Sequence, residues 1–89
     1  MIRSTVTPEG AETLALQALG WLAADEDRLG RFLGLSGMDA GTLRATAGSR
    51  DTLRAVMDFL LSDEALLLDF CEIAQIDPRT FPAYRNRLD

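Results

Sequence analysis

Apolar residues recur along most of the chain at intervals of three and four, which is the spacing of one face of an α-helix. Residues 8–24 show this pattern clearly. Their apolar face consists of Ala11, Leu14, Ala18 and Leu22, with Ala15, Leu19 and Trp21 alongside. No stretch alternates apolar and polar residues over a useful length, and Val and Ile, which favour strands, are scarce. The pattern predicts an all-α protein.

Capping residues divide this pattern into about six helices. Thr7, placed before a proline, favours a helix start, and Asp25 favours the start of a second helix. Gly37 is expected in the left-handed conformation that ends this second helix. Four further helices are expected: residues 40–47 capped by Asp39, one from Ser49 or Asp51, one from Ser62 or Asp63, and residues 78–88. Pro82 lacks a backbone donor one turn into the last helix, which predicts a kink near Thr80.

Two segments of the chain nearly repeat each other at an offset of 38 residues. Residues 21–47 read WLAADEDRLGRFLGLSGMDAGTLRATA, and residues 59–85 read FLLSDEALLLDFCEIAQIDPRTFPAYR. The identical pairs are Leu22/Leu60, Asp25/Asp63, Glu26/Glu64, Leu29/Leu67, Phe32/Phe70, Asp39/Asp77, Thr42/Thr80 and Ala45/Ala83. Self-similarity at a fixed period indicates repeated structural units. The sequence therefore predicts two pseudo-symmetric three-helix repeats packed face to face.

Length and composition fit one small compact domain. The chain has 89 residues, of which 47% are hydrophobic and 26% charged, with a net charge of −5. We expect residues 1–6 to form a flexible tail and residues 7–89 to form the helical domain. No signal peptide is visible, and the longest apolar run, Ala65 to Leu68, is far shorter than the ~20 residues of a membrane span. A cytoplasmic protein without membrane contact is expected.

The sequence contains few of the residues and motifs that are typical of catalytic or cofactor-binding sites. The chain has no His, the usual acid or base at neutral pH, and no glycine-rich phosphate loop. The single Cys71 falls mid-helix at the position equivalent to Leu33, which favours a buried structural role. The Asp–Glu pairs that begin at Asp25 and Asp63 favour helix capping over a shared four-carboxylate metal site. We therefore expect no enzymatic activity, no metal and no cofactor.

An excess of apolar residues in residues 59–73 provides the main functional indication. The inward face of the fifth helix is assigned to Leu67, Phe70, Cys71 and Ala74, which leaves further apolar residues, including Ile73, unassigned. Either these helices are covered almost all round, or part of this surface contacts a partner, foreign or a second copy. The interface hypothesis selects four anchors: Phe59, Leu61, Leu66 and Leu68.

Two further features leave alternatives open. Residues 29–47 are compatible with a DNA-binding helix-turn-helix that would use Arg44 and Arg50, although the acidic net charge argues against nucleic acid as a partner. Gly30 and Gly34 form a smooth strip that suits either close packing within the chain or a partner surface.

The strings WLAADEDRLGRFLGLSGMDAGTLR and AVMDFLLSDEALLLDFCEIAQIDP resemble a family of short bacterial proteins known only as a domain of unknown function. The resemblance extends from about Leu14 to Pro78. It implies an uncharacterised all-α protein, and it transfers no activity and no site residue to this chain.

Overall fold

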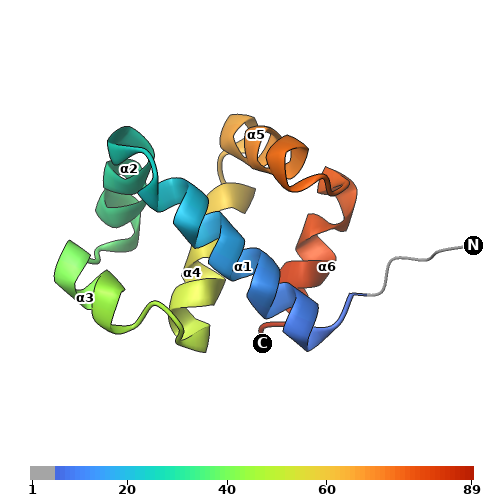
Figure 1. Ribbon diagram of the computed structural model, residues 1–89, viewed down its shortest axis with the longest axis horizontal. Helices are drawn as coiled ribbons and strands as arrows, with labels where there is room; N and C mark the ends of the chain where they lie inside the picture. Colours follow the sequence, from blue (N-terminus) through green and yellow to red (C-terminus); the bar gives the residue numbers. More distant parts are fainter. Residues whose placement is uncertain (1–5) are drawn as a thin grey trace, which may run out of the picture.

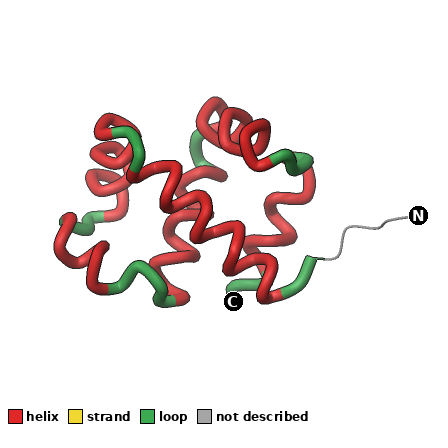
Figure 2. Tube along the Cα trace, viewed as in Figure 1, coloured by secondary structure: helices red, strands yellow, loops and turns green. Residues whose placement is uncertain are grey.

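The computed structural model describes residues 6–89, and within this range the chain forms six α-helices and one 3-10 helix, with no strand (Figures 1 and 2). In chain order these are α1 Pro8–Ala23, α2 Glu26–Ser36, α3 Ala40–Ala45, α4 Arg50–Leu61, α5 Glu64–Ala74, the 3-10 helix η1 Pro78–Thr80, and α6 Phe81–Asn86. The predicted all-α compact domain of six helices is confirmed.

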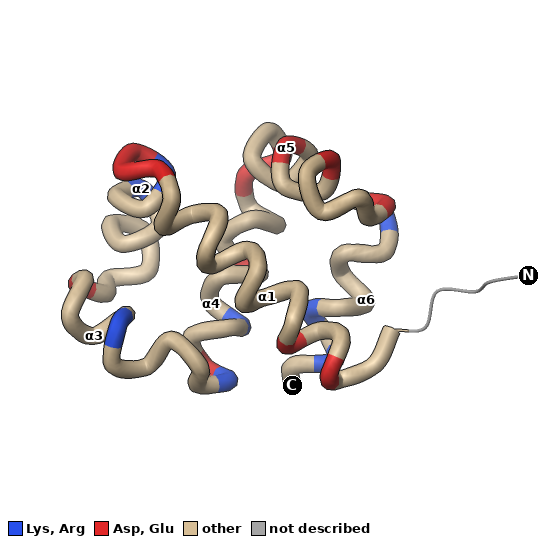
Figure 3. Tube along the Cα trace, in the orientation of Figure 1, with Lys and Arg blue, Asp and Glu red and all other residues tan. Residues whose placement is uncertain are grey.

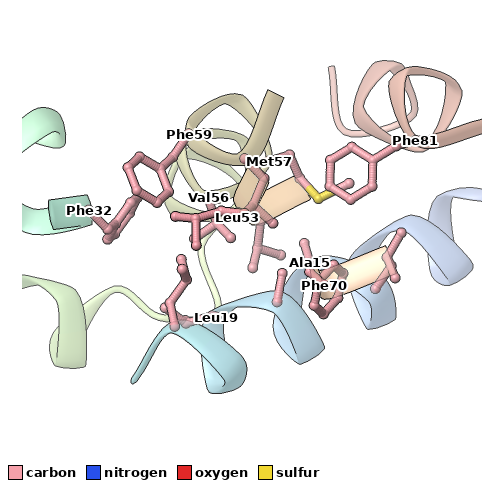
Figure 4. Packing of buried hydrophobic residues seen from close by; sticks show 14 of the residues in the cluster. Ala15, Leu19, Phe32, Leu53, Val56, Met57, Phe59, Phe70 and Phe81 are labelled. Atoms are coloured by element: carbon pink, nitrogen blue, oxygen red, sulfur yellow. The ribbon is translucent and has the colours of Figure 1, made fainter. Parts of the chain in front are cut away.

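Helices α1 and α4 cross at the centre of the molecule and share the most extensive interface between any two helices (Figure 1). The face of α1 that meets α4 contains Ala11, Ala15 and Ala18, which are fully buried. Such small side chains allow the two helices to approach closely. Larger residues of α4, among them Val56 and Met57, fill the space that remains (Figure 4).

Aromatic rings link three of the outer helices, α2, α5 and α6, to the rest of the core. Phe32 of α2 meets Phe59 of α4 edge to face, with ring centroids 5.5 Å apart. Phe70 of α5 packs against Trp21 of α1 at 5.6 Å and against Phe81 of α6 at 6.4 Å. In Figure 1, α2 and α3 lie to one side of the central pair, and α5 and α6 lie to the other. Each ring therefore joins a different outer helix to the core.

The predicted helix starts are confirmed at the level of single hydrogen bonds. Side-chain oxygens of Thr7, Asp25, Asp39, Ser49 and Asp63 each accept a bond from a backbone N–H in the first turn of the following helix. These contacts satisfy donors that would otherwise lack a partner in the helix.

The left-handed conformation predicted for Gly37 at the end of α2 is confirmed, with φ 77°. At the end of α5, Gln75 also adopts the left-handed conformation, with φ 60°. There the N–H of Ile76 donates to the carbonyl oxygen of Cys71 at 3.0 Å, and the N–H of Gln75 donates to that of Glu72 at 3.3 Å. These two bonds form a Schellman motif.

The C-terminal region follows the predicted interruption. The helix expected over residues 78–88 is divided into η1 and α6, with the break at Thr80. Pro82 then lies in the first turn of α6, where its missing N–H costs no helical hydrogen bond. Helix α3 ends at Ala45 rather than Ala47. The predicted tail, residues 1–6, lies outside the described residues except for Val6, whose carbonyl oxygen accepts a bond from Arg87 Nε at 3.1 Å.

Candidate functional site

The structure separates the four predicted anchors into buried and accessible residues. Leu68 is 46% exposed and Leu61 is half-buried. The selection of Phe59 and Leu66 as exposed anchors was wrong, because they are only 6% and 8% exposed. Phe59 packs against Phe32, as described above, and Leu66 is part of the hydrophobic core.

The error at Leu66 reflects a rotation of α5 relative to the expected orientation. The buried residues of this helix are Leu66, Phe70 and Cys71, whereas Leu67 and Ala74 are half-buried. Ile73, which was not among the predicted anchors, is 65% exposed. The outer face of α5 therefore presents two large apolar side chains, Leu68 and Ile73.

Carboxylates lie beside and between these two side chains, which project about 140° apart around the helix axis. Residues four apart lie in rows along a helix, so Leu68 lies between Glu64 and Glu72 in one row. Asp69 precedes Ile73 in the neighbouring row. All five residues are exposed, and α5 contains no basic residue (Figure 3). We call these five residues the α5 outer face.

The carboxylates of this face also lack intramolecular partners. Within residues 6–89 no ion pair involves Glu64, Asp69 or Glu72. Most arginines of the described chain are held by other acidic residues. The ion pairs are Arg28–Asp25, Arg31–Asp63, Arg50–Glu12, Arg54–Asp51, Arg79–Asp77, Arg85–Asp58 and Arg85–Asp89. The negative charge of the α5 outer face therefore remains uncompensated by these arginines.

A groove of about 340 Å³ lies on another part of the surface, between α2 and α4. It is lined by Phe32, Leu35, Ser36, Met38, Ala55, Asp58, Phe59 and Ser62. Its polar groups already have partners: the Ser62 hydroxyl donates to the Phe59 carbonyl oxygen at 2.7 Å, and Asp58 accepts from Arg85 Nε at 2.6 Å. Leu35, at its edge, is 69% exposed. The groove therefore offers mainly apolar contacts.

A smaller hollow of about 220 Å³ lies between α1, α2 and α3. Its lining is apolar apart from one residue: Leu19, Ala23, Leu29, Ala40, Leu43, Arg44 and Ala47. Neither hollow contains a pair of groups arranged for nucleophilic or acid–base chemistry.

The residues considered for catalysis or metal binding have surroundings that are typical of structural roles. Cys71 is buried, as predicted, and both burial and the nearby Asp77 raise the pKa of its thiol, which favours the unreactive protonated form. Hydrogen bonds, first from the backbone N–H of Arg28, lower the pKa of Asp25 despite partial desolvation. Within the part of the chain that the structure describes, no group of three or more His, Cys, Asp or Glu residues could hold a metal ion.

The residues of the helix-turn-helix alternative are not arranged as one surface of free cations. Arg44 is exposed on α3, which has only six residues. Arg50 Nη2 donates to Glu12 Oε2 at 2.9 Å, so its charge is compensated. Of the two arginines of this alternative, Arg44 is therefore the one whose charge no ion pair of the described residues compensates.

Gly30 and Gly34 lie on the solvent-exposed side of α2. A Cβ atom added at either position would meet no atom within 4 Å. Close packing within the chain therefore does not require these glycines, which leaves a partner surface as the remaining alternative.

None of the helices between residues 6 and 89 is both long enough and apolar enough to cross a membrane.

A family model matches residues 8–89. The chain belongs to the family described as protein of unknown function (DUF3572). The expected relationship to an uncharacterised domain family is thus confirmed. No curated protein and no solved structure matches the chain. Membership of the DUF3572 family transfers no activity and no residue role, so the function has to be argued from the surfaces described above.

Proposed function

We propose that this protein is a non-enzymatic protein-interaction module, an adaptor that binds a partner through the α5 outer face. One observation carries the proposal: two large apolar side chains of α5, Leu68 and Ile73, are 46% and 65% exposed, at the two edges of the solvent-facing side of the helix. Large apolar side chains grouped on a surface are typical of contact sites, whereas scattered ones need no explanation. Leu61, half-buried at the end of α4, belongs to the same predicted region.

We further propose that the domain consists of two pseudo-symmetric repeats. Helices α2 and α5 have equivalent bounds at the offset of 38 residues, from Glu26 to Glu64 and from Ser36 to Ala74. The left-handed residue that follows each helix is also equivalent. Both members of five equivalent pairs on α1 and α4 are buried: Leu14/Thr52, Ala15/Leu53, Ala18/Val56, Leu19/Met57 and Leu22/Leu60.

Contacts between the two halves support the same proposal. A twofold relation exchanges the halves, so a contact from one half to the other should recur with the partners interchanged. Trp21 pairs with Phe70 at 5.6 Å, and the equivalent residues Phe59 and Phe32 pair at 5.5 Å. A residue near the axis should instead meet its own equivalent. Glu12 and its equivalent Arg50 do so, at 2.9 Å.

The repeat provides an internal control for the α5 outer face. At the position of Leu68 the first repeat has Gly30, and at the position of Glu72 it has Gly34; all four positions are exposed. Helix α2 forms in the same way without these side chains, so the fold does not depend on them. This argues that Leu68 serves a contact with another molecule and not the stability of the domain.

The test is capture of partners from a lysate of the native cells with tagged wild type and with the double variant Leu68→Ser, Ile73→Ser. We expect the wild type to retain a stoichiometric protein after nuclease treatment and the double variant to lose it. Leu35→Ser is the matched control, because Leu35 is the repeat equivalent of Ile73 and is similarly exposed.

Each variant should unfold at nearly the wild-type temperature, since substitutions of exposed residues usually change stability by less than about 0.5 kcal/mol. Equal capture by wild type and double variant would contradict the proposal, and so would a loss caused by Leu35→Ser alone.

DNA binding is the second candidate function, favoured by the exposed Arg44, which has no ion pair among the described residues. Phosphate contacts give an affinity that falls steeply with salt. Duplex binding at low salt that Arg44→Ala abolishes would support this function, and absence of binding at low salt would remove it.

A further inference from the structure

We infer that the smaller hollow, between α1, α2 and α3, binds a short aliphatic carboxylate. The aliphatic chain of the ligand occupies the apolar hollow, and its carboxylate group pairs with Arg44, the charged residue of the lining. The site lies on the side of the molecule that carries α2 and α3, away from α5 (Figure 1). This inference is therefore independent of the proposed contact surface.

The shape and size of the hollow favour a small ligand with an apolar chain. The lining that α3 and the following turn contribute has intervals of three and four, so its helical part lies on one face: Ala40, Leu43, Arg44 and Ala47. The remaining lining residues are Leu19 and Ala23 of α1 and Leu29 of α2. At the ~30 Å³ that a water-sized group occupies in a liquid, about 220 Å³ holds roughly seven such groups. This volume suits a chain of about six to eight carbons.

Arg44 supplies the charge that would recognise the carboxylate. It is exposed, and it is the one arginine within residues 6–89 that has neither an ion pair nor a side-chain hydrogen bond. A guanidinium group matches the planar geometry of a carboxylate. None of the described residues that line the hollow is acidic, so no carboxylate of the lining competes for this position.

The second repeat has larger side chains at the equivalent positions. The pairs at the offset of 38 residues, with the smaller residue first, are Ala23/Leu61, Ala40/Pro78 and Leu43/Phe81. Phe81 is fully buried and packs against Phe70, with ring centroids 6.4 Å apart (Figure 4). The equivalent of Arg44 is Pro82, which carries no charge. The combination of small apolar side chains and a cation is therefore particular to the first repeat.

Apolar surface in the hollow remains open to a ligand. Leu43 is the buried residue of α3, and among the helices of residues 6–89 none contacts α3 extensively, whereas α6 packs against both α1 and α4. Leu29 is half-buried and Ala23 is exposed. An aliphatic chain would cover this surface, and each methylene that becomes fully buried raises affinity by about fourfold.

The experiment is an NMR titration of the full chain with sodium octanoate at neutral pH, in which the amide resonances report both the affinity and the place of binding. Hexanoate and heptanoate test the contribution of the aliphatic chain. Octylammonium has the same chain as octanoate and the opposite charge, so it tests the contribution of Arg44. Low salt, about 0.05 M, keeps the interaction of exposed charges measurable.

We expect octanoate to shift the amide resonances around the hollow, including those of Leu29 and Leu43, with a saturable dissociation constant of about 0.1–1 mM. Affinity should rise about two- to fourfold with each methylene from hexanoate to octanoate. Octylammonium should bind at least about threefold more weakly, because its ammonium group is repelled by Arg44.

Two variants test the two parts of the site. Ala23→Leu introduces the side chain that the second repeat has at this position and should weaken octanoate binding about fivefold or more, because it fills part of the hollow. Arg44→Gln should weaken binding about two- to fivefold. The matched control is Arg79→Gln, which removes the same charge from an exposed residue outside the hollow and should leave affinity nearly unchanged. Ala23 and Arg44 are exposed, so both variants should keep nearly the wild-type melting temperature.

Four results would overturn the inference. They are the absence of a saturable shift of the lining residues up to about 10 mM octanoate, equal affinity for octylammonium, wild-type affinity of Ala23→Leu, and shifts of the same resonances when the protein alone is diluted. The last result would show that a second copy of the chain covers the hollow. None of them concerns Leu68 or Ile73, so the proposed function is supported or refuted by its own experiment.

Discussion

Replacement of Gln75 by Gly should stabilise the protein, because Gln75 holds the left-handed conformation that ends α5. Its backbone angles are φ 60° and ψ 45°, whereas the equivalent residue of the first repeat, Gly37, has φ 77° and ψ 8°. A residue with a Cβ atom pays roughly 1–2 kcal/mol in this conformation, and Gly does not. Gly also adds entropy to the unfolded chain, which offsets about 0.4–1 kcal/mol of the gain.

The net expectation for Gln75→Gly is a free energy of unfolding about 0.5–1 kcal/mol higher. A domain of this size shifts its melting temperature by about 4–8 °C per kcal/mol, so the increase should be roughly 2–8 °C in a thermal melt followed by circular dichroism. Urea denaturation should give an unchanged slope and a higher midpoint.

Two glycines of the first repeat, one within α2 and one directly after it, supply the controls. Gly37→Ala should lower stability by about 1 kcal/mol, whereas Gly34→Ala should raise it by about 1 kcal/mol, since Ala is the better helix former. A Cβ atom at either position meets no atom within 4 Å, so both effects are conformational and not steric. A lower melting temperature for Gln75→Gly, or the same sign of effect for the two glycines, would refute the reasoning.

Three further predictions concern single residues. Arg28→Met should destabilise the protein by about 1–2 kcal/mol and shift the fluorescence of Trp21, because the guanidinium lies 4.0 Å from the centre of the indole ring and Nη2 donates to the Trp21 carbonyl oxygen at 2.7 Å; an unchanged emission spectrum would contradict this. Hydrogen bonding, mainly from the Arg28 N–H, lowers the pKa of Asp25 in the folded state, so its contribution to stability is present above its unfolded pKa and is lost as pH falls through the folded pKa. Asp25→Asn should therefore flatten the acid side of the stability profile relative to wild type, and an identical profile would argue against the assignment. Cys71 should react with a thiol reagent at mild alkaline pH only as fast as the protein unfolds, because burial raises the pKa of its thiol; rapid reaction of the native protein would contradict its buried position.

Local signals account for most of what the sequence predicted about the fold. Helix starts depend on one side chain and the backbone beside it, so Thr7, Asp25 and Asp39 could be assigned as caps without knowledge of the tertiary structure. Pro82 likewise marked the interruption between η1 and α6. Where apolar residues were spaced in a single stripe, as on α1, the buried face also followed from the sequence.

The orientation of α5 could not be read in the same way. Residues 65–68 are all apolar, so several rotations of the helix bury a similar number of apolar side chains. Contacts of Phe70 with Trp21 and Phe81 accompany the observed orientation, and both partners belong to other helices. The rotation explains why Leu66 was assigned to the surface.

The repeat contained information that would have corrected part of the site. Phe59 aligns with Trp21, and both pair with an aromatic ring of the other half, so a packing role for Phe59 was accessible from the alignment together with the core pattern. The left-handed conformation of Gln75 is a similar case. Gln at position 75 does not by itself indicate a left-handed residue, but the equivalent residue of the first repeat is Gly37, which does.

The most direct test of the central claim is photo-crosslinking in the native cells from a benzophenone amino acid placed at position 68 of the α5 outer face. We expect a crosslink to a distinct protein, with no such product from position 30, the exposed repeat equivalent on α2. Absence of any crosslinked protein from position 68, or the same product from both positions, would contradict the account of α5 as the contact surface.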